Sequence, residues 1–224
     1  MKITRIAMLL LLGVLFVLLL PVQMATADDM VNIPDHNLEA VIREAIAKPI
    51  GDIYESDLLG LWKLDASRRD IADLNGLEYC TNLRQLRLWE NQISDISPLS
   101  GLTSLTELYL MENRISDISP LSGLTSLTTL MLWGDQISDI EPLVDNPGLS
   151  SGDYVYLSDN PLSTTSIDTY IPQLEARGVE VGYNPIPSVL WAWIVIGFTV
   201  TLTVTLLVLL AAIIYFRVFR KATV

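Results

Sequence analysis

The sequence predicts an α/β solenoid, a stack of short coils in which parallel strands line one face and irregular segments line the other. Three observations predict it. A block of about 22 residues recurs at a constant step, the blocks share the pattern LxxLxLxxNxISDIxPL with few departures, and each block is too short to bury its own apolar side chains. Because such blocks become stable only when neighbours stack on them, we expect the repeats to share one continuous core.

Five copies of the block are expected, and they begin at Leu61, Leu83, Leu105, Leu127 and near Gly152. The first copy is degenerate, and the last follows three extra residues in the preceding turn. The spacing is that of leucine-rich repeats. It predicts a short leucine-rich-repeat horseshoe with a parallel β-sheet on the concave face.

The apolar positions of successive blocks should stack in columns that form the core. Burial explains all of them without any other role. The main columns are Leu83, Leu105 and Leu127; Leu86, Leu108, Leu130 and Val155; Leu88, Leu110, Leu132 and Leu157; Ile93, Ile115, Ile137 and Leu162; Ile96, Ile118 and Ile140; and Leu99, Leu121 and Leu143.

Two polar rows recur at the same step. An inward amide can donate to and accept from the backbone of neighbouring coils, which predicts a structural ladder of Asn91, Asn113 and Asn160. Asp135 interrupts this ladder, either as a functional substitution or through relaxed packing. A second row contains Asp95, Asp117 and Asp139. We expect it to cap local backbone N–H groups, the alternative being a calcium site, for which one carboxylate per coil supplies too few oxygens.

Both ends of the stack have candidate caps. The segment from Val31 carries a helical stripe after Pro34-Asp35, made of Leu38, Val41, Ile42, Ala45 and Ile46. At the other end the same spacing recurs in Ile167, Tyr170, Ile171 and Leu174. Gly178 should stop that helix, and Val179 with Val181 should add a closing strand.

The Ser-Asp-Ile-Ser-Pro-Leu repeat, the helical PDHNLEAVIREAI segment and the GLEYCTNL segment together resemble the leucine-rich-repeat region of the bacterial internalins. The resemblance covers the repeats and their caps. It implies a recognition scaffold, whose targets in such solenoids range from proteins to glycans.

The ends of the chain predict its location. Lys2 and Arg5, a leucine-rich run and Ala25-Thr26-Ala27 are typical of a cleavable secretory signal, with an uncleaved anchor as the alternative. The segment from Val189 to Phe216 contains no charged residue and is long enough to cross a bilayer. Basic residues follow this segment, which favours a cytoplasmic C-terminus. We therefore expect a single-pass protein of the cell membrane whose repeats lie outside the cytoplasm.

These features divide the chain into seven segments. They are a signal peptide (1–27), an N-terminal helical cap (28–60), leucine-rich repeats (61–164), a C-terminal cap (165–183), a short stalk (184–188), a transmembrane helix (189–216) and a cytoplasmic tail (217–224).

Charge and composition narrow the function. The segment from Asp28 to Ser188 holds nine basic and 26 acidic residues, a net charge of −17, which disfavours nucleic acid as a partner. Solubility or a cationic partner would explain such a surface. The single cysteine, Cys80, falls in the column of Leu102 and Leu124, where burial is expected.

The sequence does not predict an enzyme. The single histidine, His36, has no second histidine or cysteine with which to form a metal site, so a surface or capping role is expected. No nucleophile motif or phosphate-binding glycine loop occurs. We expect no catalytic residues, no metal and no cofactor.

The alternation of each strand predicts which side chains line the concave face. Its rows are Lys63, Gln85, Glu107, Thr129 and Tyr154; Asp65, Arg87, Tyr109, Met131 and Tyr156; and Ser67, Trp89, Met111, Trp133 and Ser158. We predict that Arg87 and one adjoining patch bind the ligand. The patch contains Trp89, Tyr109, Met111, Met131, Trp133, Tyr154 and Tyr156. The alternative is that these rings only stabilise the sheet by packing across strands.

The expected function is that of a membrane-anchored binding module that recognises a protein or carbohydrate ligand. The alternative is an accessory subunit that docks a partner in the same membrane without a soluble ligand. Within the expected transmembrane helix, Gly197, Thr201 and Thr205 lie at every fourth position on one face, a spacing that permits close approach of a second copy and hence a homo-oligomer. The alternative is a plain anchor.

Overall fold

A computed structural model describes residues 28–184 of the chain. The expected signal peptide, the transmembrane helix with Gly197, Thr201 and Thr205, and the tail lie outside the described residues. Between residues 28 and 184, no helix has the length and apolarity needed to cross a bilayer.

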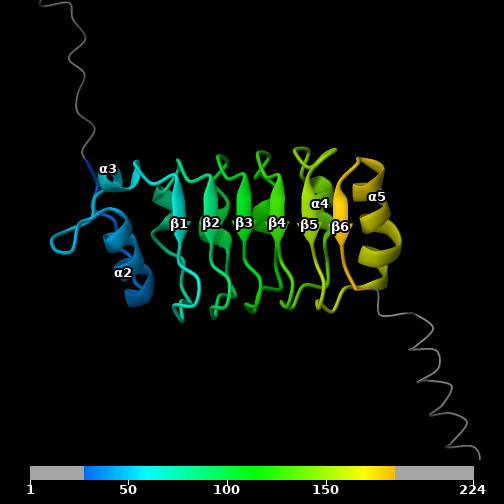
Figure 1. Cartoon of the computed structure of the whole chain (residues 1–224), viewed down its shortest axis with the longest axis horizontal. Helices are drawn as coiled ribbons and strands as arrows, with labels where there is room; N and C mark the ends of the chain where they lie inside the picture. Colours follow the sequence, from blue (N-terminus) through cyan, green and yellow to red (C-terminus); the bar gives the residue numbers. More distant parts are fainter. Residues whose placement is uncertain (1–27, 185–224) are drawn as a thin grey trace, which may run out of the picture.

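Six short parallel strands form one sheet in sequence order. They are β1 (Lys63–Asp65), β2 (Gln85–Arg87), β3 (Glu107–Tyr109), β4 (Thr129–Met131), β5 (Tyr154–Tyr156) and β6 (Glu180–Gly182). Figure 1 shows them as a row of arrows, with α2 and α3 at one end and α5 at the other. This arrangement confirms the predicted solenoid, because parallel neighbours in sequence order arise when each coil returns to the same side.

The sheet is in register from end to end. The middle residues of the strands partner one another, in the order Leu64, Leu86, Leu108, Leu130, Val155 and Val181. All but Val181 are buried, and the residues on either side of them face outward. The constant step of the repeat therefore places equivalent side chains of successive coils beside one another.

The predicted columns form a single core. Every column member named above has at most 1% of its surface exposed, except Leu162, which is only partly buried. Leu162 belongs to the last coil, so no further repeat stacks on it. Cys80 is fully buried in this core as expected, and burial raises the pKa of its thiol to about 12.

Short helical turns form the side opposite the sheet. These are η1 (Leu77–Tyr79), η2 (Ser97–Leu99), η3 (Ser119–Leu121) and α4 (Glu141–Asp145). The aspartate row caps the last three, since the carboxylates of Asp95, Asp117 and Asp139 accept the backbone N–H groups two residues on at 2.8–2.9 Å. The predicted capping role is confirmed.

The asparagine ladder is also confirmed. The side-chain amide of Asn113 donates to the carbonyls of Leu88 and Leu110, while its oxygen accepts the N–H of Ile93 in the preceding coil. Asn91 and Asn160 make the equivalent bonds one coil earlier and two coils later. Each amide thus joins two coils at a turn that would otherwise leave buried carbonyls unpaired.

The N-terminal cap consists of α2 (His36–Ala45) and α3 (Glu55–Leu58). Asp35 begins α2 by accepting the N–H groups of Asn37 and Leu38, and its second oxygen accepts those of Ala72 and Asp73 in the first coil. One carboxylate therefore both caps the helix and attaches it to the stack.

The predicted helical stripe is wrong at one residue. Leu38, Val41 and Ile42 are buried, but Ala45 is exposed. The helix ends at this residue, and Ile46 packs against the core in its place.

The C-terminal cap is built from η4 (Ser166–Tyr170), α5 (Ile171–Ala176) and the closing strand β6. Gly178 ends α5 with a φ of +87°, as its position predicted. Arg177 donates to the carbonyls of Val144 and Asn146, which fastens the cap to the last turn. Gly148 is required in that turn, because a Cβ there would overlap the carbonyl group of Thr125.

Candidate functional site

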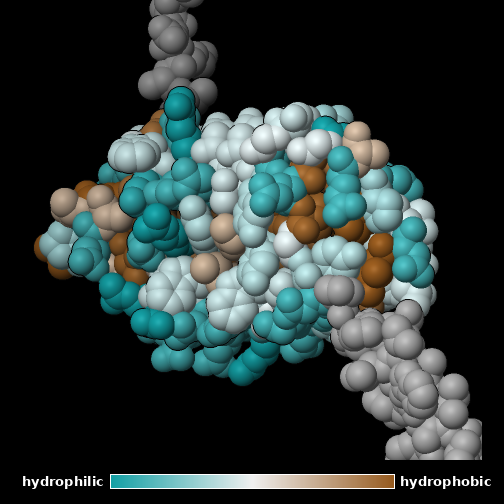
Figure 2. Space-filling model, turned by 45° about the vertical axis from the view of Figure 1, so that its right-hand side comes forward, coloured by the Kyte–Doolittle hydropathy of each residue, from teal (hydrophilic) through white to brown (hydrophobic). Residues whose placement is uncertain are grey.

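The in-register sheet brings the predicted patch residues together on its exposed face, which we call the concave face. All seven aromatic and methionine side chains and Arg87 lie at outward positions and are half-buried. Figure 2, which brings the α5 end forward, shows tan and brown patches interrupted by pale and teal side chains. The visible surface is therefore amphipathic rather than continuously apolar.

Ser158 was predicted to face outward in the third row, and this prediction is wrong. Only 2% of its surface is exposed. The closing segment lies beside it, since Leu157 donates to the carbonyl of Gly182 and the Asn184 amide donates to Asp159. The cap therefore covers the end of the row.

In the N-terminal half of the concave face, arginines of the chain cover the aromatic rings. The guanidinium of Arg68 lies 4.2 Å from the centroid of the Trp89 ring and forms a two-pronged ion pair with Glu90 at 2.7–2.8 Å. Hydrogen bonding to Glu90 raises the pKa of Arg68, and the same contact lowers the pKa of Glu90. The arginine is thus held over the ring by a carboxylate of the next coil.

Arg87 makes a similar contact one row away. Its guanidinium lies 5.3 Å from the Tyr109 ring and 3.7 Å from the carboxylate of Asp65. The Tyr109 hydroxyl donates to Glu107, which also accepts the Gln85 amide. Burial, followed by the hydrogen bond to Glu107, raises the pKa of Tyr109. Most polar groups in this half of the face already have partners within the chain.

The C-terminal half of the concave face is different. The rings of Tyr154 and Tyr156 are nearly parallel, with centroids 6.2 Å apart and planes at 14°. Gly182 lies beside them in β6, where a Cβ would overlap the Tyr156 ring. Glycine therefore lets the Tyr156 ring lie against the closing strand.

A strained turn follows the third row in each coil. Arg68, Glu90, Glu112 and Asp159 occupy it with φ between 52° and 59°, while the fourth coil has Gly134 with φ of 74°. Left-handed backbone costs a non-glycine residue about 1 kcal/mol or more. The turn positions charged side chains along the edge of the concave face.

Asp135 follows Gly134 and is the one carboxylate in the asparagine ladder. One oxygen accepts the N–H of Ile115 at 3.0 Å, and the other is buried without a hydrogen-bond partner. In the neighbouring coils an amide NH₂ occupies the equivalent place and donates to two carbonyls. Burial raises the pKa of Asp135 to about 7.

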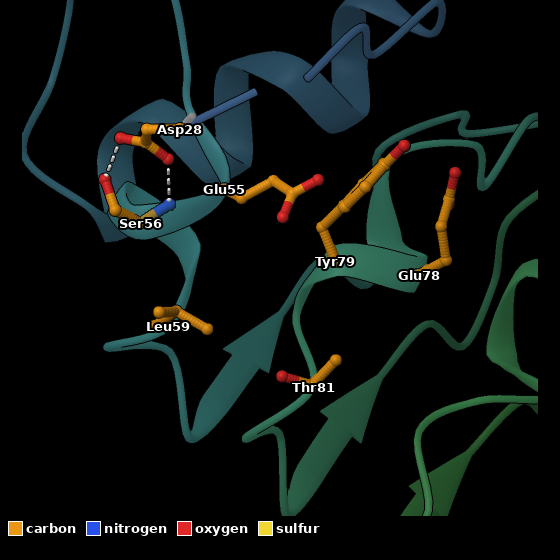
Figure 3. Close-up of a pocket in the computed structure, with 7 residues that line it drawn as sticks. All are labelled: Asp28, Glu55, Ser56, Leu59, Glu78, Tyr79 and Thr81. Atoms are coloured by element: carbon orange, nitrogen blue, oxygen red, sulfur yellow. Dashed lines mark hydrogen bonds between the residues drawn. The ribbon is translucent and has the colours of Figure 1, made fainter. Parts of the chain in front are cut away.

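A separate hollow lies at the N-terminal end, between α3 and η1. It has a volume of about 350 Å³ and is lined by Asp28, Glu55, Ser56, Leu59, Glu78, Tyr79 and Thr81. Figure 3 shows that the Asp28 carboxylate is hydrogen-bonded to Ser56. The Glu78 carboxylate accepts the backbone N–H of Gly76. Within residues 28–184, no group of three or more histidine, cysteine or acidic side chains is placed to hold a metal ion.

His36 is almost fully exposed at the start of α2, 3.7 Å from Glu39. Four large apolar side chains of residues 28–184 are also exposed, and sequence reasoning did not predict their exposure. They are Met30, Ile50, Leu59 and Trp62, all in the N-terminal cap or the first coil.

Sequence reasoning missed Arg68 and Glu112 as members of the concave face. Both lie one residue beyond the third row, in the strained turn, so strand alternation did not include them. Arg68 precedes Trp89, and Glu112 precedes Trp133, by one residue less than a full repeat. This spacing is visible in the sequence and could have indicated both residues.

Comparison with known proteins supports the assignment of the repeats. A family model of leucine-rich repeats in two copies matches residues 103–145. A crystal structure of an internalin, InlF from Listeria monocytogenes, superimposes with a TM-score of 0.58 at 30% identity, covering 73% of this chain and 56% of that one. The functional domain of InlJ from the same organism, whose structure includes a cysteine ladder, gives a TM-score of 0.52 at 28% identity, covering 58% and 28%.

These matches support leucine-rich repeats as the class of the described domain. More narrowly, its fold is similar to that of the Listeria internalins. The chain spans little more than half of the InlF structure and about a quarter of the InlJ domain. No curated protein matches the sequence.

Proposed function

We propose that the protein is a membrane-anchored, extracytoplasmic binding module that recognises a protein or glycan ligand through its concave face. The observation that carries the proposal is the in-register array of seven aromatic and methionine side chains on a rigid sheet. Stacked repeats generally present extended concave surfaces for binding. Trp and Tyr supply much of the binding energy at such surfaces.

The proposal assigns binding and not catalysis. A catalytic site needs a nucleophile or an acid and base with matched pKa values in a protected cleft. The strongly shifted carboxyl of the described residues, Asp135, lies inside a turn with its partners in the backbone. Its carboxyl is therefore enclosed in the fold and not presented to a reacting ligand.

Membrane attachment is the part of the proposal that rests on sequence. The leader at residues 1–27 and the uncharged segment 189–216 would place the repeats outside the cell membrane, close to its surface. The row of Gly197, Thr201 and Thr205 would then allow two copies to associate. An oligomerisation reporter fused to the segment should lose signal in a Gly197→Leu variant, and an unchanged signal would eliminate the association.

The second candidate is an accessory subunit that docks a partner in the same membrane. The exposed Met30, Ile50, Leu59 and Trp62 favour it, because exposed apolar side chains that gather at one end of a domain commonly mark a contact. In this case the N-terminal end, or the transmembrane helix, would contact the partner. No soluble ligand would be needed.

Capture by a soluble fragment separates the two candidates. Residues 28–184 share one core that is closed by a cap at each end, so a fragment from Asp28 to Ser188 contains the complete stack. The binding module should capture a protein or glycan with this fragment and lose it in a Trp89→Ala/Trp133→Ala double variant. Equal capture by the parent fragment and the double variant would eliminate the aromatic patch as the binding site. Capture that needs the membrane segment would favour the accessory subunit.

A further inference from the structure

The two tryptophans of the concave face occupy equivalent places in the second and fourth coils. The backbone N–H of Arg68 donates to the carbonyl of Trp89 at 3.0 Å, and that of Glu112 donates to the carbonyl of Trp133 at 2.9 Å. Glu112 therefore occupies the same backbone position relative to Trp133 as Arg68 occupies relative to Trp89. The surroundings of the two rings can be compared directly within one chain.

The chemistry at the two places is opposite. Arg68 lies over the Trp89 ring and is held there by Glu90. Beside Trp133, the arginine is replaced by Glu112 and the carboxylate partner by Gly134. A Cβ at Gly134 would lie 3.3 Å from Cγ of Glu112, so glycine leaves room at the side of that glutamate.

In the described part of the chain, no cation lies over the Trp133 ring and no basic group forms an ion pair with Glu112, although the charge of Glu112 contributes to the raised pKa of Arg68. Glu112 is exposed and forms no ion pair there, and the cation–ring contacts found there are those of Lys48, Arg68 and Arg87. Beyond Arg114 the one basic residue up to Asn184 is Arg177, which is bound to two carbonyls of the C-terminal cap. Among residues 28–184, no cation of the chain covers this half of the face.

We propose that the C-terminal half of the concave face binds a guanidinium or ammonium side chain from a basic segment of a partner protein. The cation would stack on the Trp133 ring and pair with Glu112, as Arg68 stacks on Trp89 and pairs with Glu90. This inference rests on the proposed function of the concave face and names the chemistry of its ligand.

Arginine fits this place better than lysine. A planar guanidinium stacks on an indole ring and still presents N–H donors at its edge to a carboxylate. The intramolecular contact of Arg68 shows that a guanidinium over the equivalent tryptophan, Trp89, can pair at the same time with a carboxylate of the strained turns. Tyr154 and Tyr156 lie in the adjoining strand and offer two further ring faces to the same segment.

The charge of the domain agrees with a basic partner. Residues 28–188 carry a net charge of −17, which attracts a cationic segment and repels acidic glycans and nucleic acid. Glu180, which pairs with Tyr154 across β5 and β6, adds an acidic residue beside the tyrosines. Binding should therefore weaken as salt is added.

The test uses the full chain in a nonionic detergent and short fluorescent peptides of glycine and serine that carry arginine, lysine, glutamate or no charged residue. The arginine peptide should bind best, the lysine peptide more weakly, and the other two not measurably. Trp133→Leu and Glu112→Gln should each weaken the arginine peptide by about 5-fold, as expected for one cation–ring contact or one charged pair. Thermal unfolding confirms that each variant is folded.

The second coil supplies matched controls. Trp89→Leu and Glu90→Gln remove the same groups where an arginine of the chain already occupies the ring, so they should change peptide affinity by less than about 2-fold. The inference is overturned if neither basic peptide binds, if the two coils respond equally, or if only salt and none of the variants affects binding. A neutral glycan or uncharged peptide captured through Trp89 and Trp133 would overturn it while leaving the proposed function intact.

Discussion

Replacing Asp135 by asparagine should stabilise the protein, and the gain should depend on pH. The buried, unpartnered oxygen of Asp135 takes the place of an amide NH₂ that donates to two carbonyls in the neighbouring coils. In the third coil the equivalent Asn113 donates to Leu88 and Leu110. An asparagine at position 135 would restore such bonds to the ladder.

The size of the effect follows from the carboxyl's pKa, which burial raises from 3.8 to about 7. A raised folded-state pKa means that the folded protein binds the proton more tightly than the unfolded chain. Stability is therefore greatest below the unfolded value, falls as pH rises from 3.8 to about 7, and levels off above that. At about 1.4 kcal/mol for each pH unit, the ionised carboxylate costs on the order of 4 kcal/mol.

Urea unfolding of the parent and the Asp135→Asn variant, followed by circular dichroism, measures this difference. Near pH 8 the variant should be more stable by roughly 4–5 kcal/mol, and near pH 4 by only about 1 kcal/mol, the contribution of the restored hydrogen bonds. Asp139→Asn is the matched control, because that exposed carboxylate only caps a turn. A gain that does not change with pH would refute the reasoning.

Three further outcomes are expected. Asn113→Ala leaves a buried N–H and two carbonyls without their side-chain partner and should lower the free energy of unfolding by about 2–4 kcal/mol in the same assay, whereas substitution of the exposed His36 should not. Gly148→Ala forces a Cβ against the backbone of Thr125 and should cost about 3 kcal/mol or more, while Gly101→Ala, which meets nothing within 4 Å, should cost less than about 1 kcal/mol. The Cys80 thiol, buried and with its pKa raised to about 12, should react with iodoacetamide only in urea; fast labelling of the native protein would contradict this.

The core and the ladders could be predicted from the sequence because the period fixes the register. Once Leu86 and Leu108 are placed one repeat apart in successive coils, every other position of the repeat has a defined neighbour, and apolar residues at those positions can only face the stack. The capping by Asp95 and Asp117 follows equally, since it involves backbone two residues away.

The errors lie where the repeat ends. Ser158 is covered by the closing segment, and Ala45 is exposed where the cap helix ends. Leu162 packs against the core as predicted but is only partly buried, since no further coil follows it. A periodic pattern describes a coil that has neighbours on both sides, so it does not predict burial at a cap. For the same reason the exposed Trp62, in the degenerate first coil, was not foreseen.

The sequence predicted which residues line the concave face, but it did not predict the difference between the two halves of that face. Strand alternation placed Trp89 and Trp133 in one row and treated them alike. The difference between them depends on a diagonal contact from the preceding coil, where Arg68 and Glu112 occupy a left-handed turn that carries no strand pattern. The structure shows that the Arg68 side chain at this turn reaches the ring of Trp89 in the next coil.

The fourth coil differs from the neighbouring coils at three places. Gly134 removes the backbone strain that Glu90 and Glu112 carry, Asp135 replaces the ladder amide, and Trp133 lies beside a glutamate instead of an arginine. Selection for stability alone would keep asparagine in the ladder, since asparagine occupies it in the coils on either side. The fourth coil accepts an ionisable group in its turn, two residues after Trp133, whose ring has no cation of residues 28–184 over it. It thereby gives up stability beside the surface where the concave face is proposed to bind its ligand. Replacing Asp135 by asparagine should leave the proposed cation site intact while stabilising the protein most above neutral pH.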